Sequence, residues 1–401
     1  MSESQGAAPL SGFRVLDFTQ VVAGPFCATM LADMGAEVVK IERPGFGDDT
    51  RRITRYKDRE EHEDYFYANN RSKKSFAVNM KTEAGRGAVR ALAGEADALI
   101  ENMAPGKLAE LGLGFEDARA MNPRIVYCSL SGFGQSGPYR DRVGLDPILQ
   151  AVSGVMSVTG TEDPTQIGAP LADVLAGMFS AYAIVSALHA VAREGEGRHI
   201  DVSMQDAMVA ALGPRMGETL QAGVSPGRHG NENPMRVPAN TYRTSDGEYV
   251  TVIVQHDGFW PGFCRALGIE DWLEDERFST ARARVANRDA INERASKIFA
   301  SRTMAEWERR LEAERVGFAV VNDYARALSD PQVAHRGLIK SVEHPVSGGI
   351  RVVGAPWIMS GAVADVKPPP LLGQHTADVL REWLEWPEEE VARFMAGEGV
   401  R

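Results

Sequence analysis

A strand–helix–strand pattern near the N-terminus indicates the class of fold. A short apolar run at residues 15–18 predicts a strand, and residues 37–41 predict a second one. Between them, the loop at residues 23–25 leads into a predicted helix over residues 26–34. Proline at its start and glycine just past its end favour these helix boundaries. Because a single crossover helix joins parallel strands with a right-handed connection, this unit predicts a parallel sheet.

The alternation of strands and helices continues through the first 200 residues. It predicts helices over residues 83–93 and 171–192, and strands over residues 98–101, 125–129 and 200–202. Elements that alternate in this order build an open, mostly parallel sheet with helices on its faces. We therefore predict the α/β class, with a Rossmann-like large domain.

A stretch rich in glycine, proline and asparagine divides the chain. Residues 222–238 predict a linker, which follows the N-terminal part of the large α/β domain at residues 1–221. A smaller α+β domain is predicted at residues 239–325. We expect residues 326–401 to return and complete the large domain.

The small domain is predicted from one hairpin and two helical stretches. The turn signal at residues 244–247 lies between two strand-like runs, which favours a hairpin. Helices are expected over residues 259–267 and 284–315.

Charge and cysteine content exclude several classes of protein. Lys and Arg number 44 against 55 Asp and Glu, and the net charge of −11 argues against nucleic acid or an anionic membrane as a partner. Three widely spaced cysteines without a CxxC pattern indicate a reducing compartment, and the N-terminus lacks the pattern of a signal peptide. We expect a cytoplasmic protein. Within the apolar stretch 167–192, the interruptions at Pro170, Asp173, Gly177 and His189 favour a core helix over a membrane span.

Two glycine-containing strings match known motifs only by pattern. Residues 132–137 fit G-x-G-x-x-G, but Pro138 continues a loop where a dinucleotide-binding fingerprint must open a helix. Residues 223–227 fit G-x-S-x-G, but they lie in the predicted linker and Pro226 follows the serine. The eight histidines show no metal-ligand spacing, so we predict no metal site.

Asp173 is the most informative single residue. It is the only carboxylate in the apolar stretch 166–192, and an unpaired buried carboxylate is costly. One interpretation is a first-turn acid that stabilises a helix after Pro170. The other is a nucleophile or proton carrier that backbone N–H groups hold ionised. Asp146, followed by Pro147, is predicted to be an ordinary helix N-cap.

A local excess of basic residues lies in an otherwise acidic protein. It suggests either phosphate binding or a solvated face balanced by the nearby acids Asp48, Asp49, Glu60 and Glu61. The basic residues are Arg43, Arg51, Arg52, Arg71, Lys73, Lys74 and Lys81.

Several segments, in this order along the chain, resemble the family III CoA-transferases, which include formyl-CoA transferase. The resemblance runs from about Leu10 to Leu380. The segments that carry it are VLDFT at 15–19, AGP at 23–25, GAEVVKIE at 35–42, NRSKKS at 70–75, ENMAPG at 101–106, SGFG at 131–134, GAPLAD at 168–173, VSMQDA at 202–207 and LGQHT at 372–376.

The resemblance implies roles for individual residues. The family's nucleophile is an aspartate just before a long helix, which places that role on Asp173. The implied CoA contacts are Val22, Ala23, Arg43, Val78, Asn79, Met80, Lys81, Asn102, Met103 and Ala104. The family also implies an interlocked homodimer, CoA thioesters as substrates, and no tightly bound cofactor or metal.

The implied reaction is transfer of CoA from an acyl-CoA to a carboxylic acid through an aspartyl-CoA thioester, with succinyl-CoA as a family-level donor. Val22 stands where formyl-CoA transferase has glutamine, and the glycine run of that enzyme is absent, which argues against oxalate and formate. Leu145 stands where α-methylacyl-CoA racemases have histidine, which argues against epimerisation. The alternatives are such a racemase, a nicotinamide-dependent oxidoreductase, and a CoA-binding module without chemistry.

Overall fold

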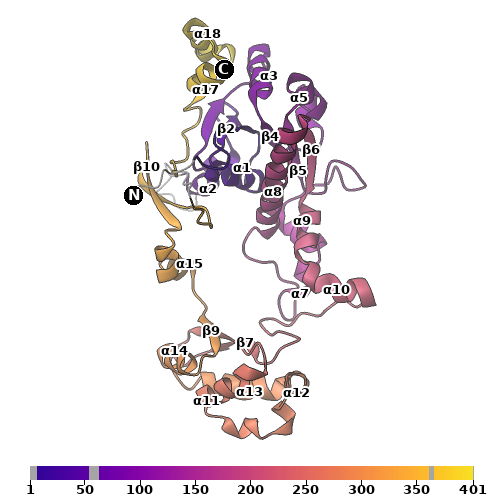
Figure 1. The fold of residues 1–401 in the computed structure, drawn as a ribbon, viewed down its shortest axis with the longest axis vertical. Helices are drawn as coiled ribbons and strands as arrows, with labels where there is room; N and C mark the ends of the chain where they lie inside the picture. Colours follow the sequence, from indigo (N-terminus) through magenta and orange to yellow (C-terminus); the bar gives the residue numbers. More distant parts are fainter. Residues whose placement is uncertain (1–6, 54–62, 361–364, 401) are drawn as a thin grey trace. The chain divides into compact units, whose positions relative to one another are not determined.

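The computed structural model describes residues 7–53, 63–360 and 365–400. The chain forms two compact units (Figure 1). The first consists of Met1–Val155, Ile167–Val224 and Ala334–Arg401, and the second of Met156–Gln166 and Ser225–Val333. The domain boundaries at residues 221, 238 and 325 stay predictions.

A six-stranded sheet forms the centre of the first unit. Its order is β3-β2-β1-β4-β5-β6, and every neighbouring pair is parallel. The strands are β1 Arg14–Asp17, β2 Glu37–Glu42, β3 Lys74–Ala77, β4 Ala98–Glu101, β5 Val126–Ser131 and β6 Arg198–Ser203. This is the strand order of the Rossmann fold, so the predicted α/β class and parallel sheet are confirmed.

Helices cover both faces of this sheet (Figure 1). Neighbouring residues of a strand point to opposite faces, and Val15 and Leu16 of β1 accordingly belong to different core clusters. The cluster of Val15 includes residues of α1 (Ala23–Asp33) and α8 (Leu171–Glu194). The cluster of Leu16 includes residues of α3 (Glu83–Glu95) and α17 (Thr376–Leu384). The C-terminal segment therefore packs into the core of the first unit.

Shorter elements complete the first unit. They are η1 Asp49–Arg52, α2 Asp64–Ala68, α4 Lys107–Glu110, α5 Phe115–Met121, α6 Asp146–Val152, α9 Met204–Ala211, α10 Gly213–Ala222, β10 Ile339–His344, β11 Gly348–Val353, α18 Glu388–Arg393 and η6 Phe394–Glu398. Strands β10 and β11 form an antiparallel hairpin. At the boundary with the second unit lie α7 Val155–Val158 and α16 Pro331–His335.

The second unit contains an antiparallel three-stranded sheet, β7-β8-β9. Its strands are β7 Ala239–Arg243, β8 Tyr249–Ile253 and β9 Gly317–Val320, and its helices are η3 Asp257–Phe259, α11 Trp260–Leu267, η4 Glu270–Leu273, η5 Glu276–Phe278, α12 Ala281–Ala286, α13 Arg288–Phe299, α14 Met304–Ala313 and α15 Tyr324–Leu328. The hairpin is confirmed, but the continuous helix predicted over residues 284–315 is wrong. It is divided at Asn287, and again before Thr303, which begins α14 with a capping box.

Helix α8 is long and apolar enough to cross a membrane, by length and composition alone. In the structure it packs against α1 and α9 and against strand β5. Only part of its most apolar window is buried, and Met178, Phe179 and Tyr182 lie exposed. The predicted core helix therefore has one packed side and one exposed apolar side.

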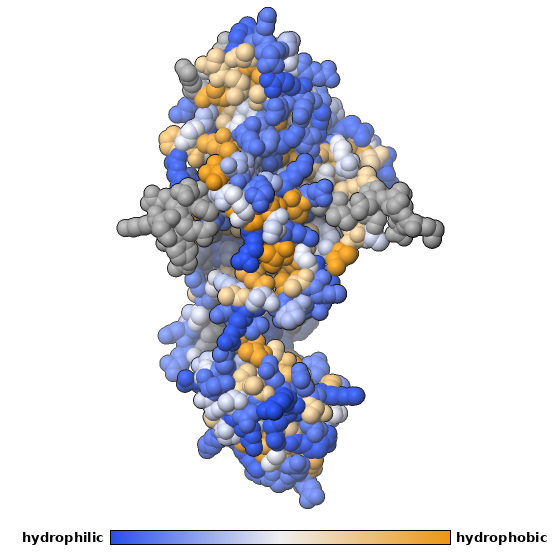
Figure 2. All heavy atoms as spheres, turned by 90° about the vertical axis from the view of Figure 1, so that its left-hand side faces the viewer, coloured by the Kyte–Doolittle hydropathy of each residue, from blue (hydrophilic) through white to orange (hydrophobic). Residues whose placement is uncertain are grey.

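Polar and charged side chains cover much of the face that Figure 2 shows. Apolar side chains gather among them near the middle of the first unit. Scattered apolar surface of this kind is ordinary in a folded protein.

Candidate active site

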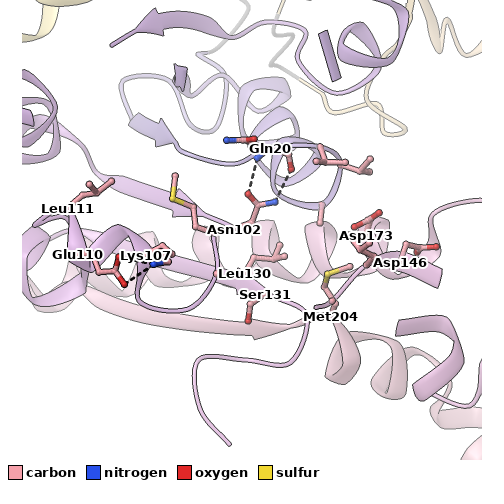
Figure 3. Close-up of a pocket in the computed structure, with 18 residues that line it drawn as sticks. Gln20, Asn102, Lys107, Glu110, Leu111, Leu130, Ser131, Asp146, Asp173 and Met204 are labelled. Carbon is pink, nitrogen blue, oxygen red and sulfur yellow. Dashed lines mark hydrogen bonds and ion pairs between the residues drawn. The ribbon is translucent and has the colours of Figure 1, made fainter. Parts of the chain in front are cut away.

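The main cavity opens where two neighbouring strands end. Strands β1 and β4 lie side by side at the point where the strand order reverses, and ligands of open α/β sheets bind beyond the carboxyl ends of such strands. The loop after β1 and the loop after β4 are joined there by two hydrogen bonds. The Gln20 N–H donates to Asn102 Oδ1 at 2.9 Å, and Asn102 Nδ2 donates to the Gln20 carbonyl at 2.8 Å (Figure 3).

This cavity has a volume of about 640 Å³. It brings Asp173 together with five of the predicted CoA contacts, and Figure 3 shows Asp173 beside Asp146 at one end. The predicted residues that line it are Val22, Ala23, Asn102, Met103, Ala104 and Asp173.

The other predicted contacts line a second cavity of about 450 Å³. They are Arg43, Val78, Asn79, Met80 and Lys81. The two cavities share Gln20, Met103 and Leu111 as lining residues, so they adjoin each other. The structure thus places every predicted site residue on one continuous stretch of surface in the first unit.

Asp173 lies in the first turn of α8, which begins at Leu171 after the N-cap residue Pro170. Burial raises the pKa of its carboxyl to about 7, and the charge of Asp146 adds to the rise. Among the described residues, no group donates a hydrogen bond to this carboxylate. The expected hydrogen bonds from backbone N–H groups are therefore not formed, and burial disfavours the ionised form of the carboxyl.

Asp146 does not cap its own helix. Leu145 occupies the N-cap position of α6, and Asp146 is the first helical residue. Its Oδ1 instead accepts the Ala172 N–H at 2.7 Å, and its Oδ2 accepts a hydrogen bond from Gln150 Nε2 at 2.8 Å. The ordinary N-cap predicted from the Asp-Pro pair is wrong, since this carboxylate satisfies the beginning of α8.

Several residues of the site were not among those predicted from the sequence. Gln20 and Ser131 line the main cavity where strands β1 and β5 end, and the rule for parallel sheets could have indicated both. Met204 comes from the start of α9. No sequence pattern indicates Tyr65. It is close enough to the site that, after burial, the charges of Asp173 and Asp146 raise the pKa of its phenol.

Neither interpretation of the basic cluster holds for all of its members. Arg51, Arg71, Lys73 and Lys74 form ion pairs inside the first unit, with Glu42, Asp33, Asp17 and Glu37 as respective partners. Arg43 and Lys81 alone line the second cavity, and Arg52 lies over the Phe46 ring. Glu60 and Glu61 lie outside the described residues.

The pattern matches behave as ordinary loops. The stretch 132–137 follows β5 and continues without a helix until α6 at Asp146, so no dinucleotide fingerprint forms. Ser225 lies in a stretch without helix or strand after α10. Over residues 7–53, 63–360 and 365–400, no group of three or more His, Cys, Asp or Glu side chains could hold a metal ion; His62 is outside these ranges.

The profile of CoA-transferase family III matches residues 10–376. The chain belongs to this family. It is 37% identical over 398 residues to the succinyl-CoA:glutarate CoA-transferase of Mus musculus, covering 98% of this chain and 91% of the relative. It is 39% identical over 387 residues to the succinate–glutarate CoA-transferase of Agrobacterium fabrum, covering 93% and 95%.

A solved structure agrees with this assignment. The crystal structure of a CaiB/BaiF family protein from Brucella suis superposes with a TM-score of 0.84 at 35% identity, covering 94% of this chain and 100% of that one. The predicted family and its activity are confirmed: this chain is a family III CoA-transferase, an enzyme that moves CoA from a thioester to a carboxylic acid.

Proposed function

We propose that this CoA-transferase uses succinyl-CoA as donor and glutarate, or a dicarboxylate of similar length, as acceptor. The names of the similar relatives from Mus musculus and Agrobacterium fabrum support this choice of acids. The single observation that carries the mechanism is the place of Asp173. Its carboxylate lines the main cavity, and with a pKa of about 7 the ionised and the protonated forms coexist near neutral pH.

The reaction begins with attack of the Asp173 carboxylate on the thioester carbonyl of the donor. The C–S bond breaks, CoA leaves as a thiolate, and a mixed anhydride forms. The thiolate attacks the aspartyl carbonyl, which gives an aspartyl-CoA thioester and releases succinate. The acceptor carboxylate then displaces CoA as a second mixed anhydride forms, and the returning thiolate takes the acceptor acyl group. Covalent catalysis of this kind divides one difficult exchange into easier steps.

The two adjoining cavities fit the two ends of an acyl-CoA. Arg43 and Lys81 give the second cavity its positive charges, which suit the phosphates of the nucleotide end. The thioester end belongs in the main cavity beside Asp173 and the loop at Val22 and Ala23. Because one thioester replaces another, the chemistry requires no redox cofactor and no external energy source.

We further propose that the protein forms a homodimer and is located in the cytoplasm. The exposed Met178, Phe179 and Tyr182 on α8 support a homodimer, since such a patch is suited to an interface. The interlocked form of that dimer comes from the family resemblance. The buried free thiols of Cys27, Cys128 and Cys264 support the reducing conditions of the cytoplasm.

The experiment that tests the function traps the activated aspartate. The enzyme is incubated with succinyl-CoA and hydroxylamine, and its peptides are mapped by mass spectrometry. A hydroxamate on Asp173 that depends on succinyl-CoA is the expected result. If succinyl-CoA binds but Asp173 stays unmodified, and the substrate exchanges its α-proton with deuterated water, the racemase alternative replaces this proposal.

A further inference from the structure

Four charged side chains form a fully buried cluster beneath the loop after β1. Lys73 Nζ lies 2.9 Å from Asp17 Oδ2, and Lys40 Nζ lies 3.0 Å from Asp48 Oδ2. All four side chains are 0% exposed, and the two positive and two negative charges balance. None of the four lines either cavity of the active site.

Such a cluster is a poor way to stabilise a fold. Removing charges from water costs as much as their mutual attraction returns, and apolar residues of similar volume often serve stability better. The desolvation is severe enough that it lowers the pKa of Lys73 to about 8. The cluster therefore calls for a role beyond stability, and its outward hydrogen bonds indicate one.

These hydrogen bonds converge on the backbone of residues 19–25. Lys40 Nζ donates to the Thr19 carbonyl at 2.6 Å, and Lys73 Nζ donates to the Pro25 carbonyl at 2.9 Å. Asp17 Oδ1 accepts the Thr19 N–H at 2.9 Å. The cluster thus forms hydrogen bonds to both ends of the segment that lines the main cavity.

The middle of this segment has an unusual conformation. Val21 has φ of 70°, in the left-handed region that a β-branched residue rarely adopts. Its side chain is not packed, since the residue is 43% exposed. Its N–H donates to Asp48 Oδ1 at 3.3 Å, so the buried cluster also holds the strained position.

The strained turn sets the direction of the groups that follow it. Val22 and Ala23 line the main cavity with Asp173, at the start of helix α1. Among the described residues, no acceptor receives the N–H groups of Val22, Ala23 and Gly24. These N–H groups at a helix start are suited to a developing negative charge, provided that the loop keeps its position.

We propose that Asp17, Lys40, Asp48 and Lys73 are positioning residues, which hold Val21 in its left-handed conformation and fix the loop at Val22 and Ala23 against the reacting thioester. In each ion pair, both side chains hydrogen-bond to the backbone of residues 19–25. In this proposal they act through that backbone and do not contact the substrate. The part of this proposal that concerns turnover rests on the proposed function, whereas the part that concerns CoA binding does not.

The first test compares two neutralised ion pairs. The variant Lys73→Met with Asp17→Asn removes the bond to Pro25 while leaving no unpaired buried charge. The control, Arg71→Met with Asp33→Asn, removes another buried pair of the first unit, one that contacts the far end of α1. We expect kcat to fall about 100-fold in the first variant, the loss typical of a misplaced reacting group, and to stay within about threefold of the parent in the control.

The second test isolates the bond to Val21. Both variants carry Lys40→Met, combined with Asp48→Asn in one and with Asp48→Ala in the other. Asparagine keeps an oxygen for the Val21 N–H, whereas alanine does not. We expect the alanine variant to have the lower kcat, by about tenfold or more, which is the order of one backbone donor in an oxyanion site, with a smaller change in KM.

CoA affinity, measured by calorimetry on the same folded variants, separates the two proposals. If the parent enzyme transfers no CoA between the named acids but its affinity for CoA falls in the Lys73 and Asp48→Ala variants, the proposed substrates fail and the positioning role stands. If the Lys73 and Arg71 variants lose activity and affinity alike, or if Asn and Ala at residue 48 are equivalent, the positioning role is overturned.

Discussion

Asp146 binds the N–H of Ala172 and thereby lies beside Asp173, whose pKa it helps to raise. One carboxylate thus fixes the start of α8 and adds negative charge next to the proposed nucleophile. The arrangement keeps Asp173 basic, because burial and a like charge both disfavour its ionised form.

The pH dependence of transfer follows from this pair. In the proposed mechanism Asp173 attacks only when it is ionised, so we expect kcat/KM to rise with pH and to level off above a pKa near 7. Asp146→Asn keeps an oxygen for the Ala172 N–H and removes the charge. Its acid limb is expected to move to lower pH in a pH–rate profile.

A matched carboxylate controls for general charge effects. Glu110 also lines the main cavity, but it pairs with Lys107 and does not contribute to the shift at Asp173. Glu110→Gln is expected to leave the acid limb where it is. An unshifted limb in Asp146→Asn would falsify the coupling between Asp146 and Asp173.

The raised pKa of Asp173 also predicts that its ionised form, which transfer requires, lowers the stability of the fold. Between pH 4 and pH 7 the folded state holds a proton that the unfolded state releases, so stability falls as pH rises through this window. Asp173→Asn removes the ionised form. We expect it to abolish transfer. We also expect it to raise Tm at pH 8 and to raise it less at pH 5, by about 2 °C or less for each kcal/mol, because the shift becomes smaller as the chain becomes longer.

Thermal melts at the two pH values provide the measurement, with intact mass to exclude deamidation of the new asparagine. A Tm that drops at pH 8, or rises equally at both pH values, would show that ionised Asp173 is not a cost to folding.

The second cavity predicts a charge-dependent KM. Arg43 and Lys81 line it and face no carboxylate partner among the described ion pairs, so they are available for phosphates. Either residue changed to Ala is expected to raise KM for acyl-CoA about tenfold with little change in kcat, as befits a charge-assisted hydrogen bond. Steady-state kinetics at two salt concentrations test this.

Arg52 supplies the control for those variants. It lies over the same Phe46 ring as Arg43 and donates to the Gly45 carbonyl, but it does not line the cavity. Arg52→Ala is expected to leave KM nearly unchanged. Equal effects at Arg43 and Arg52 would contradict the assignment of the second cavity to the nucleotide end.

Local pattern predicted most of the parallel sheet, because each strand is a short apolar run with a turn signal beside it. Strand β3 was missed, since it begins with Lys74 and Ser75 and contains only one large apolar residue, Phe76. Lys73 and Lys74 looked like surface because their partners, Asp17 and Glu37, lie far away in the sequence.

The site shows the same limit of sequence reasoning. Asp173 was found because a lone carboxylate in an apolar helix is conspicuous. The direction of its pKa shift was not predicted, because it depends first on the burial of the carboxyl in the folded chain and then on the charge of Asp146, which comes from another helix. The N-cap predicted for Asp146 failed for the same reason: the backbone N–H that its carboxylate accepts belongs to Ala172 in α8 and not to the start of α6.

Gly24 offers a final test of the loop that begins α1. A Cβ built on Gly24 would lie 2.2 Å from Thr19 Cβ, and Asp17 holds the Thr19 hydroxyl in place through its Oδ1. Gly24→Ala must therefore move either the helix start or the Thr19 side chain. We expect a loss of about 1–3 kcal/mol in the free energy of unfolding, as in other overpacked sites, together with a large loss of transfer activity.

Gly87 is the matched control, because it lies inside α3 and a Cβ there meets nothing within 4 Å. Gly87→Ala is expected to stabilise the fold by about 0.5–1 kcal/mol through helix propensity, without affecting transfer. Denaturant unfolding and kinetics on both variants decide the matter. If Gly24→Ala is as stable and as active as Gly87→Ala, the close approach of Thr19 to α1 does not constrain the loop.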